Sequence, residues 1–524
     1  MDVPLSDALP RHPARVRAEL RSRPVASAPA PAPAPDPTSA PGRPGPASRS
    51  LVERLAEALR DERVAYVQWK GNWKSARWMS GEGDIDLLVD RSSEPRFSGV
   101  LWALGFKRAE APPKSAIAGI ESHFGLDPAT GRLIHVHAHY RLIAGGIHGT
   151  VYRLPIEEPL LASAIQGTVF RVPAPEFELV AFAVRMVQRY GTIQTLRHRE
   201  PAWLKGIQGE LDALLAKTDR ARLADILDRH LPNLDVPFID ACLASLRPDF
   251  SRWARIPLRR ELHRRMRAHA RRPPVVLTLS RMARWLVTLG GRLAGRTGDE
   301  KRFAHGGTVV TLVGGDGSGK STCTRELRAW LSGEFSVITA HLGRPPRSLL
   351  TLAVGAVFKI ARALGMCATT DEERTRAPGY LAAVRDLCTA RDRYHLYAKA
   401  RRFALAGGIA LCERYPIPQN RELCGPELDR FAAQLGRTRF GRWLIGAEAS
   451  YYRKILRPDA VIVLLVDPEI AVQRKTDEPA DYVRERGRLV WNVDWKGAGA
   501  HVVDAGRPLA QVLADLKAVL WREL

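Results

Sequence analysis

The sequence has few cysteines, and none of them are closely paired. Six cysteines occur in 524 residues, without a CxxC pair and without regular spacing. Closely spaced cysteines are typical of disulfide-rich secreted domains and of zinc ribbons, so the sequence argues against both classes. Unpaired thiols suit a reducing compartment, and we expect a cytoplasmic protein.

Long apolar runs are also missing. The apolar segment from Leu349 to Phe358 is stopped by Lys359, and the segment from Val275 to Leu289 is interrupted by Arg281 and Arg284. A membrane-spanning helix needs about 20 predominantly apolar residues in succession. We therefore predict no transmembrane segment and expect a soluble protein, with a peripheral membrane contact left open.

Acidic residues are outnumbered by basic ones. Lys and Arg total 80 against 56 Asp and Glu, which gives a formal net charge of +24. Such an excess favours polyanionic partners such as nucleotides, nucleic acid or an anionic membrane face, although a coding bias towards arginine would produce the same number. Much of the excess lies between Arg252 and Arg302, so a nucleic-acid contact is one alternative there.

Composition divides the chain into four parts, because 524 residues are too many for one ordinary hydrophobic core. Residues 1–48 are rich in Pro and Ala and carry few large apolar side chains, so we predict a disordered tail without the apolar segment of a secretory signal. The other parts are an α+β module with a helical second half at 49–250, a basic helical connector at 251–305 and an α/β domain at 306–524.

Strands and helices alternate regularly in the last part. Apolar and β-branched runs predict strands at Thr308–Val313, Ser336–Ala340, Ile409–Cys412 and Ala460–Val466, with helices from Lys320 and over Gly379–Ala406. Strands separated by helices are typical of a parallel sheet that is wound by helices on both faces. We therefore predict this fold for residues 306–524.

A glycine-rich motif follows the first of these strands and opens a helix. The run Gly-Gly-Asp-Gly-Ser-Gly-Lys-Ser-Thr from Gly314 to Thr322 matches GxxxxGK[ST] without a mismatch. In such a loop the backbone N–H groups surround the β-phosphate of ATP, Lys320 reaches the β- and γ-oxygens, and the Ser321 hydroxyl binds Mg²⁺. The candidate ATP-binding residues are Gly314, Asp316, Gly317, Ser318, Gly319, Lys320, Ser321 and Thr322.

The loop and four later segments resemble thymidylate kinases in their residue motifs and in the order of these motifs along the chain. The later segments are Ala390–His395, Gly408–Tyr415, Pro458–Glu469 and a lid-like stretch that begins at Arg474 and ends near Arg488. The resemblance covers about 215 residues and implies a kinase that uses ATP and Mg²⁺. It further implies that Arg393 grips the phosphate of the acceptor and that Glu413 stands where the family usually has aspartate.

The same residues suit phosphoryl transfer on chemical grounds. Glu413 ends a buried strand beside the loop, where an acid can hold the Mg²⁺ shell or orient the acceptor. Arg393 and Arg414 offer planar forks that match a phosphate. Catalysis also needs cations at the transferred phosphoryl group, and the lid candidates are Arg474, Arg484 and Arg486, although each could be a solvated surface charge.

Two departures from the family leave the acceptor open. The second strand is followed by His341-Leu342-Gly343-Arg344-Pro345-Pro346-Arg347 instead of an Arg-Glu-Pro-Gly-Gly run, and Tyr415 is followed by Pro-Ile-Pro-Gln-Asn. We expect a nucleoside monophosphate similar to dTMP as the acceptor. The alternatives are a kinase for a sugar or another small molecule, and a regulatory or nucleic-acid-binding ATPase. A dimer is one oligomeric state left open.

The N-terminal module resembles the nucleotidyltransferase fold of the polymerase β superfamily. A glycine turn at Gly71 precedes a strand that carries Asp84 and Asp86 as an Asp-x-Asp pair. Side chains two apart on a strand share one face, so both carboxylates can meet the Mg²⁺ of a nucleoside triphosphate. We therefore assign these two aspartates as candidate metal ligands.

The third carboxylate of that superfamily has no evident counterpart. The strand predicted at its position carries His135, His137 and His139 on one face, and Asp127 is a candidate substitute acid. Imidazoles in this arrangement can hold zinc in place of a missing acid. Alternatively, they are hydrogen-bonded or surface histidines of a degenerate enzyme.

Overall fold

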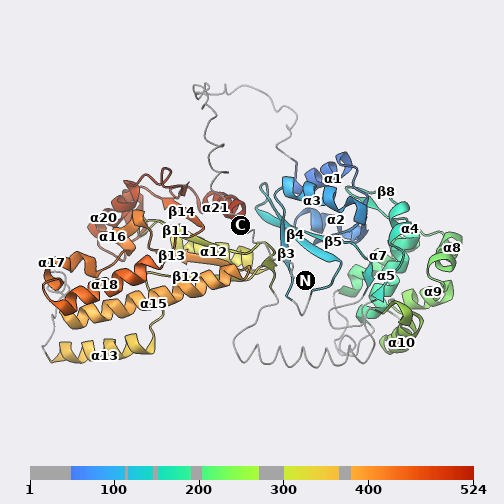
Figure 1. The fold of residues 1–524 in the computed structure, drawn as a ribbon. Coiled ribbons are helices and arrows are strands. Elements are labelled where there is room, and N and C mark those ends of the chain that lie inside the picture. The colour runs from blue at the N-terminus through green and yellow to red at the C-terminus, as the bar shows by residue number, and fades with distance from the viewer. Residues whose placement is uncertain are drawn as a thin grey trace, which may run out of the picture. The chain divides into compact units, whose positions relative to one another are not determined.

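The computed structural model describes most of the chain. The described residues are 49–112, 116–144, 152–190, 203–248, 250–270, 300–364 and 379–524. The tail predicted at 1–48 lies outside them, as do residues 271–299 of the predicted connector. Figure 1 shows two sheets, each with its own helices, which confirms a mixed α/β protein.

The first sheet has six strands in the order β1-β2-β5-β4-β3-β10. β2 and β5 are parallel, and the other neighbouring pairs are antiparallel. The strands are β1 (Tyr66–Lys70), β2 (Asp84–Val89), β3 (Lys107–Glu110), β4 (Ile120–Asp127), β5 (Arg132–His139) and β10 (Arg302–Phe303). The last of them comes from the predicted connector, so this segment adds an edge strand that its sequence did not predict.

Helices and short strand pairs complete the module around this sheet. The first helix begins with a capping box, in which the Ser50 hydroxyl accepts from Glu53 N–H and the Glu53 carboxylate accepts from Ser50 N–H. Apolar residues of this helix and of the third helix share one buried cluster with β1, β2 and β5. The elements are α1 (Leu51–Asp61), α2 (Ser75–Met79), α3 (Glu94–Ala103), β6 (Ile143–Ala144), β7 (Tyr152–Arg153), α4 (Glu157–Ala162), β8 (Ile165–Gln166) and β9 (Arg171–Val172).

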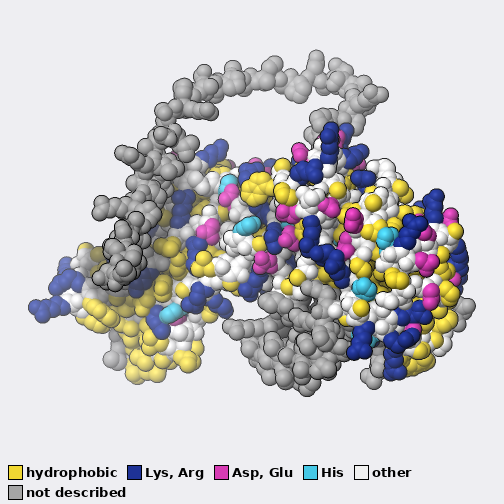
Figure 2. Space-filling model, turned by 45° about the vertical axis from the view of Figure 1, so that its right-hand side comes forward, with side chains coloured by type: hydrophobic (Ala, Val, Ile, Leu, Met, Phe, Trp, Pro, Cys, Tyr) yellow, Lys and Arg dark blue, Asp and Glu magenta, His cyan; other side chains and the backbone are white. Residues whose placement is uncertain are grey.

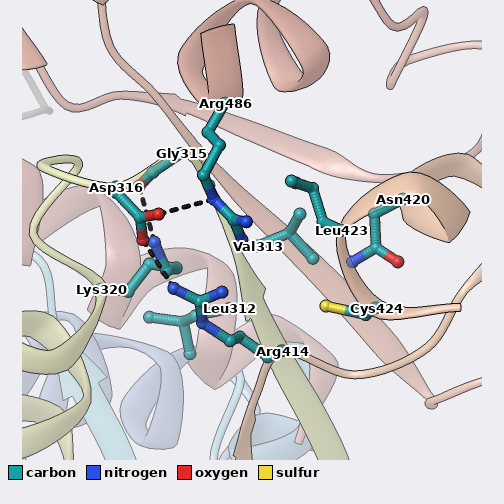
Figure 3. A pocket seen from close by; sticks show the side chains of 11 residues that line it. Leu312, Val313, Gly315, Asp316, Lys320, Arg414, Asn420, Leu423, Cys424 and Arg486 are labelled. Atoms are coloured by element: carbon teal, nitrogen blue, oxygen red, sulfur yellow. Dashed lines mark hydrogen bonds and ion pairs between the residues drawn. The ribbon is translucent and has the colours of Figure 1, made fainter. Parts of the chain in front are cut away.

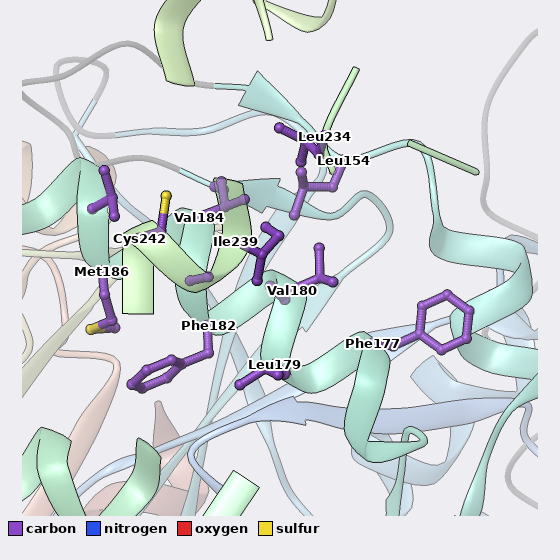
Figure 4. Close-up of a cluster of buried hydrophobic side chains, with 14 of the residues drawn as sticks. Leu154, Phe177, Leu179, Val180, Phe182, Val184, Met186, Leu234, Ile239 and Cys242 are labelled. Atoms are coloured by element: carbon purple, nitrogen blue, oxygen red, sulfur yellow. The ribbon is translucent and has the colours of Figure 1, made fainter. Parts of the chain in front are cut away.

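A helical bundle follows, as the sequence predicted. Its helices are α5 (Pro175–Tyr190), α7 (Trp203–Leu215), α8 (Arg220–His230), α9 (Val236–Ala244) and α10 (Arg255–Arg265). Nearly every side chain of α5 is buried, because this helix is surrounded by the others. Figure 4 shows Phe182, Val184 and Ile239 among the apolar side chains that meet in this core.

The second sheet is parallel throughout, which confirms the predicted strand arrangement. Its order is β12-β13-β11-β14-β15, with β11 in the middle and buried along its whole length. The strands are β11 (Thr308–Val313), β12 (Val337–His341), β13 (Ile409–Glu413), β14 (Ala460–Leu465) and β15 (His501–Asp504). The chain crosses from one side of β11 to the other between β13 and β14, and ligands of such sheets bind at the carboxyl end of this point.

Helices connect these strands, and a last helix follows β15. They are α12 (Lys320–Ser332), α13 (Leu349–Ala363), α15 (Tyr380–Leu405), α16 (Arg421–Cys424), α17 (Ala432–Leu435), α18 (Arg439–Arg453), α19 (Pro468–Arg474), α20 (Ala480–Trp491) and α21 (Leu509–Glu523). Among the described residues, no helix is both long and apolar enough to cross a membrane.

Candidate functional site

The glycine-rich loop joins the central strand β11 to the first turn of α12. Gly317 and Gly319 have φ angles of +80° and +82°, a region that favours glycine because a Cβ atom is strained there. A Cβ on Gly317 would also lie 2.5 Å from the backbone oxygen of Ala471. The local sequence therefore permits the tight turn that brings backbone N–H groups and the N-terminus of α12 to the end of the sheet.

Lys320 is the first residue of α12 and is buried. Its Nζ donates a hydrogen bond to the backbone oxygen of Gly315 at 2.6 Å. Burial lowers the pKa of Lys320 to about 8, although the charge of Asp316 opposes this shift. The ammonium group is thus held against the loop, in a place where an anionic ligand would favour its charged form.

The two predicted Mg²⁺ ligands of this domain are in contact. The Ser321 Oγ donates a hydrogen bond to Oε2 of Glu413 at 2.9 Å, although 92 residues separate them. Glu413 stands at the carboxyl end of β13, which pairs directly with β11. A hydroxyl and a carboxylate oxygen are donors of the kind that Mg²⁺ prefers, so the pair fits this ion.

Asp316 binds two of the predicted arginines. Its Oδ1 accepts a hydrogen bond from Nη2 of Arg414 at 2.6 Å, and its Oδ2 lies 2.7 Å from Nε of Arg486 in an ion pair. Figure 3 shows both guanidinium groups turned towards Asp316, beside Lys320. Arg414 has a φ angle of +50°, which is uncommon for a residue other than glycine and is typical of functional sites.

These residues line one pocket of about 300 Å³, part of which is open to solvent. We call it the loop pocket. Its lining residues are Leu312, Val313, Gly314, Gly315, Asp316, Lys320, Arg414, Asn420, Leu423, Cys424 and Arg486. The short helix α16, which follows β13, contributes Leu423 and Cys424. Neither residue was predicted from the sequence. No motif marked them, because their place depends on how the chain folds back after β13.

Arg393 lies near this pocket on α15. It is buried, donates from Nε to the backbone oxygen of Leu342 at 2.7 Å and stacks over the Tyr452 ring. Burial raises the pKa of the Cys424 thiol, and four cations nearby oppose this effect. They are Arg414, Arg393, Arg486 and Lys320. Cations from four separate elements therefore converge on this region.

The structure separates the three arginines of the predicted lid. Arg474 donates to the backbone oxygens of Ala505 and Gly506, and Arg484 binds carboxylates on the surface of α19 and α20. Of these three, Arg486 alone lines the loop pocket. Both Arg484 and Arg486 lie on α20, two positions apart, so they point in different directions from the helix.

The aspartate pair of the first sheet faces the histidines of its parallel neighbour. Asp84 is paired with His135 and Asp86 with His137 in the strand register. Asp86 also forms an ion pair with Lys70 at 2.9 Å. The candidate acid Asp127 lies elsewhere, where it accepts hydrogen bonds from Leu51 N–H and the Thr130 hydroxyl.

Two proteins of Escherichia coli are similar to part of this chain. Each has the name Uncharacterized ATP-binding protein YghR, one from strain K12 and the other from strain O6:H1. Both are 24% identical to the chain over 213 residues, which are 39% of this chain and 83% of each relative. No protein-family model matches the sequence.

Proposed function

We propose that residues 306–524 form a P-loop kinase similar to thymidylate kinases, which binds ATP and Mg²⁺ and phosphorylates a small anionic acceptor. One observation carries this proposal: the GxxxxGK[ST] loop joins a central parallel strand to a helix, and its Ser321 contacts Glu413 of the neighbouring strand. The name of the Escherichia coli relatives, an ATP-binding protein, supports ATP as the nucleotide.

The proposed reaction moves the γ-phosphoryl group of ATP. The bond between the γ-phosphorus and the β–γ bridging oxygen breaks, a bond to an acceptor oxygen forms, and ADP leaves. Lys320 binds the β- and γ-oxygens, and the hydroxyl of Ser321 and the carboxylate of Glu413 hold Mg²⁺. When bound, Mg²⁺ neutralises charge on these phosphate oxygens.

Arg414 and Arg486 have a further role in this proposal. Without a nucleotide, Asp316 pairs with both guanidinium groups, and its single negative charge leaves one positive charge uncompensated. A phosphate in the loop pocket offers the same arginines a stronger, bidentate partner. We propose that they leave Asp316 for the transferred phosphoryl group, where charge must be stabilised.

The convergence of cations favours an acceptor that is itself negatively charged. Lys320, Arg393, Arg414 and Arg486 act on the region around Cys424. A nucleoside monophosphate such as dTMP brings a phosphate to this region, whereas a neutral sugar does not. A kinase for a sugar or another small metabolite is the alternative, because the segment after β12 departs from the thymidylate kinase pattern.

A panel of acceptors tests the proposal. The full chain is incubated with γ-labelled ATP, Mg²⁺ and a set of nucleoside monophosphates and sugars, and the labelled product is identified. We expect a labelled nucleoside diphosphate in the wild type, and a rate lower by about 10² to 10³ in Lys320→Ala, the scale for losing one preorganised charged group. ATP hydrolysis without transfer to any acceptor would support a regulatory ATPase instead.

We also propose that residues 49–250 have a nucleotidyltransferase-like fold, joined to the kinase through a basic connector. The support is the position of Asp84 and Asp86 two residues apart on one face of β2, each beside a histidine of β5. If the connector instead binds nucleic acid, affinity for it will fall steeply as salt rises, because released counterions drive such binding.

A further inference from the structure

We infer that Asp84, His135 and His137 form a binding site for a divalent transition metal such as zinc. Their ligand atoms, one from each side chain, lie within 4.8 Å of one another. The site is in the first sheet and uses none of the residues of the loop pocket. It therefore does not depend on the proposed kinase function.

The backbone places these side chains together. β2 and β5 are parallel neighbours, and their register sets Asp84 directly beside His135. His137 follows two residues later, on the same face of β5 as His135. Three ligands thus come from two strands in the middle of a sheet, which hold them more rigidly than a loop would.

The distances are those of a small coordination site. Nδ1 of His135 lies 2.6 Å from Oδ1 of Asp84, and Nδ1 of His137 lies 3.8 Å from Oδ2 of the same carboxylate. Ligand atoms about 2.0 Å from a tetrahedral zinc ion are about 3.3 Å apart, which lies between these two values.

Charge also favours a cation at Asp84 rather than at its neighbour. Asp86 already has a cationic partner in Lys70. Among the described residues, neither Lys nor Arg forms an ion pair with Asp84, whose contacts are the two histidines. The carboxylate of Asp86 lies 3.3 Å from Nδ1 of His137, and its charge is balanced by Lys70.

The donor set selects the class of metal. Two imidazoles and one carboxylate suit zinc, cobalt or nickel, whereas Mg²⁺ prefers oxygen ligands throughout. The Asp84 side chain is 49% exposed, so one side of the site is open to solvent. Three protein ligands with an open fourth position are typical of zinc sites that bind a water or a substrate.

Cobalt titration of the full, untagged chain tests the site. The protein is stripped with a chelator, and Co²⁺ is added while the visible absorption of tetrahedral cobalt is followed. We expect one equivalent to bind, zinc to displace it, and a millimolar excess of Mg²⁺ to leave it in place. His137→Gln and Asp84→Asn should each weaken the affinity more than about tenfold, as expected for losing a metal ligand or its support.

A matched control removes an imidazole elsewhere. His501 contacts Glu523 at 3.0 Å in the second sheet, so His501→Gln breaks a similar pair but should leave cobalt binding unchanged. Asp84→Asn keeps the shape of a half-exposed side chain, and its circular dichroism should match the wild type. Cobalt binding that survives both ligand variants, or that shows the near-ultraviolet band of thiolate ligands, would overturn the inference.

The site and the kinase can fail separately. Lys320→Ala should leave the cobalt titration unaltered, since Lys320 lies on α12, which follows the central strand of the other sheet. Loss of cobalt binding in Lys320→Ala would contradict an independent site. An absence of phosphotransfer in the wild type would overturn the proposed function while leaving the metal titration as it stands.

Discussion

At the scale of single residues, the loop pocket combines buried and partly buried charges that a ligand would rearrange. Lys320 is bound to a backbone oxygen, and Arg414 and Arg486 share the carboxylate of Asp316. A charge taken out of water needs a hydrogen-bonding or charged partner. In the free protein, the Gly315 oxygen and the Asp316 carboxylate occupy the places that phosphate oxygens would take.

Above pH 8, the protein should take up a proton at Lys320 when ATP binds. Burial lowers the pKa of Lys320 to about 8, so the free side chain is largely neutral at pH 8.5, and a bound triphosphate favours the ammonium form. Calorimetry at pH 8.5 in buffers with different ionisation enthalpies measures this uptake. Lys320→Arg is the control, because arginine stays charged and takes up nothing. Identical heats for the wild type in all buffers would contradict the prediction.

Arg486 and Arg484 form a matched pair for mutation. Arg486→Ala should lower kcat more than tenfold with little effect on ATP affinity, because the guanidinium acts mainly in the transition state. Arg484→Ala should change kcat less than twofold, since its partners are Glu469 and Asp481 on the surface. Steady-state kinetics decides between the two residues. Equal losses in both variants would argue against a special role for the pocket arginine.

The free energy of unfolding of the first module should fall as pH rises, because Glu178 loses its proton. Burial raises the pKa of its carboxyl to about 7, and Asn72 Nδ2 donates to it at 3.0 Å. The folded state therefore binds the proton more tightly than the unfolded chain, so stability falls between about pH 4.5 and pH 7. The free energy of unfolding of Glu178→Gln, relative to that of the wild type, should rise by about 1 to 3 kcal/mol between pH 4.5 and pH 8, because one pKa unit corresponds to about 1.4 kcal/mol.

Denaturant unfolding of both proteins at the two pH values measures this difference. The amide of glutamine can still accept from Asn72, so the hydrogen bond is kept. Unfolding midpoints that move in parallel for the two proteins would show that Glu178 does not titrate in this range.

At the scale of elements, α20 and the glycine-rich loop are in close backbone contact. A Cβ on Gly315 would lie 3.0 Å from Cα of Gly487 in α20, a tighter approach than side chains normally make. Because α20 also carries Arg486, the position of this helix sets how far the guanidinium extends into the pocket. The contact therefore couples the loop to the arginine.

Gly315→Ala should weaken ATP binding about tenfold or more, because the added methyl group pushes the loop and α20 apart. Gly333→Ala is the control: its φ angle is ordinary, and nothing lies within 4 Å of its Cβ position. Equilibrium binding of a fluorescent ATP analogue compares the two variants, with thermal unfolding as the check on folding. Equal ATP affinities of the two variants would mean that the loop accommodates the added methyl group without weakening ATP binding.

Helix α13 exposes an apolar surface. Leu349 is 86% exposed, and further apolar side chains of this helix are half-exposed or more. It is attached to α15 by Asp392, whose carboxylate accepts from Ser348 N–H and the Thr351 hydroxyl. Figure 2 shows hydrophobic side chains gathered on the side where Figure 1 places this helix.

At the scale of the whole molecule, each sheet carries its own acids and its own candidate metal site. Among the described residues, β3 pairs with the edge strand β10, and Trp521 Nε1 donates to the Gly105 oxygen at 3.1 Å. Phe124 of β4 packs on Phe335 and also stacks on His135, but none of these contacts involves a residue of the loop pocket. The two sites should therefore work independently.

Replacing both aspartates tests this independence. Asp84→Asn with Asp86→Asn should leave phosphotransfer by the full chain within twofold of the wild type, while metal binding by the first module is lost, since amides cannot neutralise a cation. Acceptor phosphorylation and cobalt titration are measured on the same preparation. A large loss of phosphotransfer would mean that the two sheets form one composite site.

The sequence alone determined the features that depend on neighbouring residues. The loop from Gly314 to Thr322, the parallel alternation around it and the shared strand face of Asp84 and Asp86 are local patterns, and the backbone follows them directly. The helical second half of the first module was predictable for the same reason.

Only the tertiary structure decided which distant residues meet. It brought Ser321 to Glu413, left Arg486 in the pocket while Arg474 and Arg484 bind elsewhere, and joined β10 to the first sheet. The physical reason is that each of these contacts depends on strand order and on the rotation of a helix about its axis. Both are set by packing between segments far apart in the chain, and spacing in the sequence does not encode them.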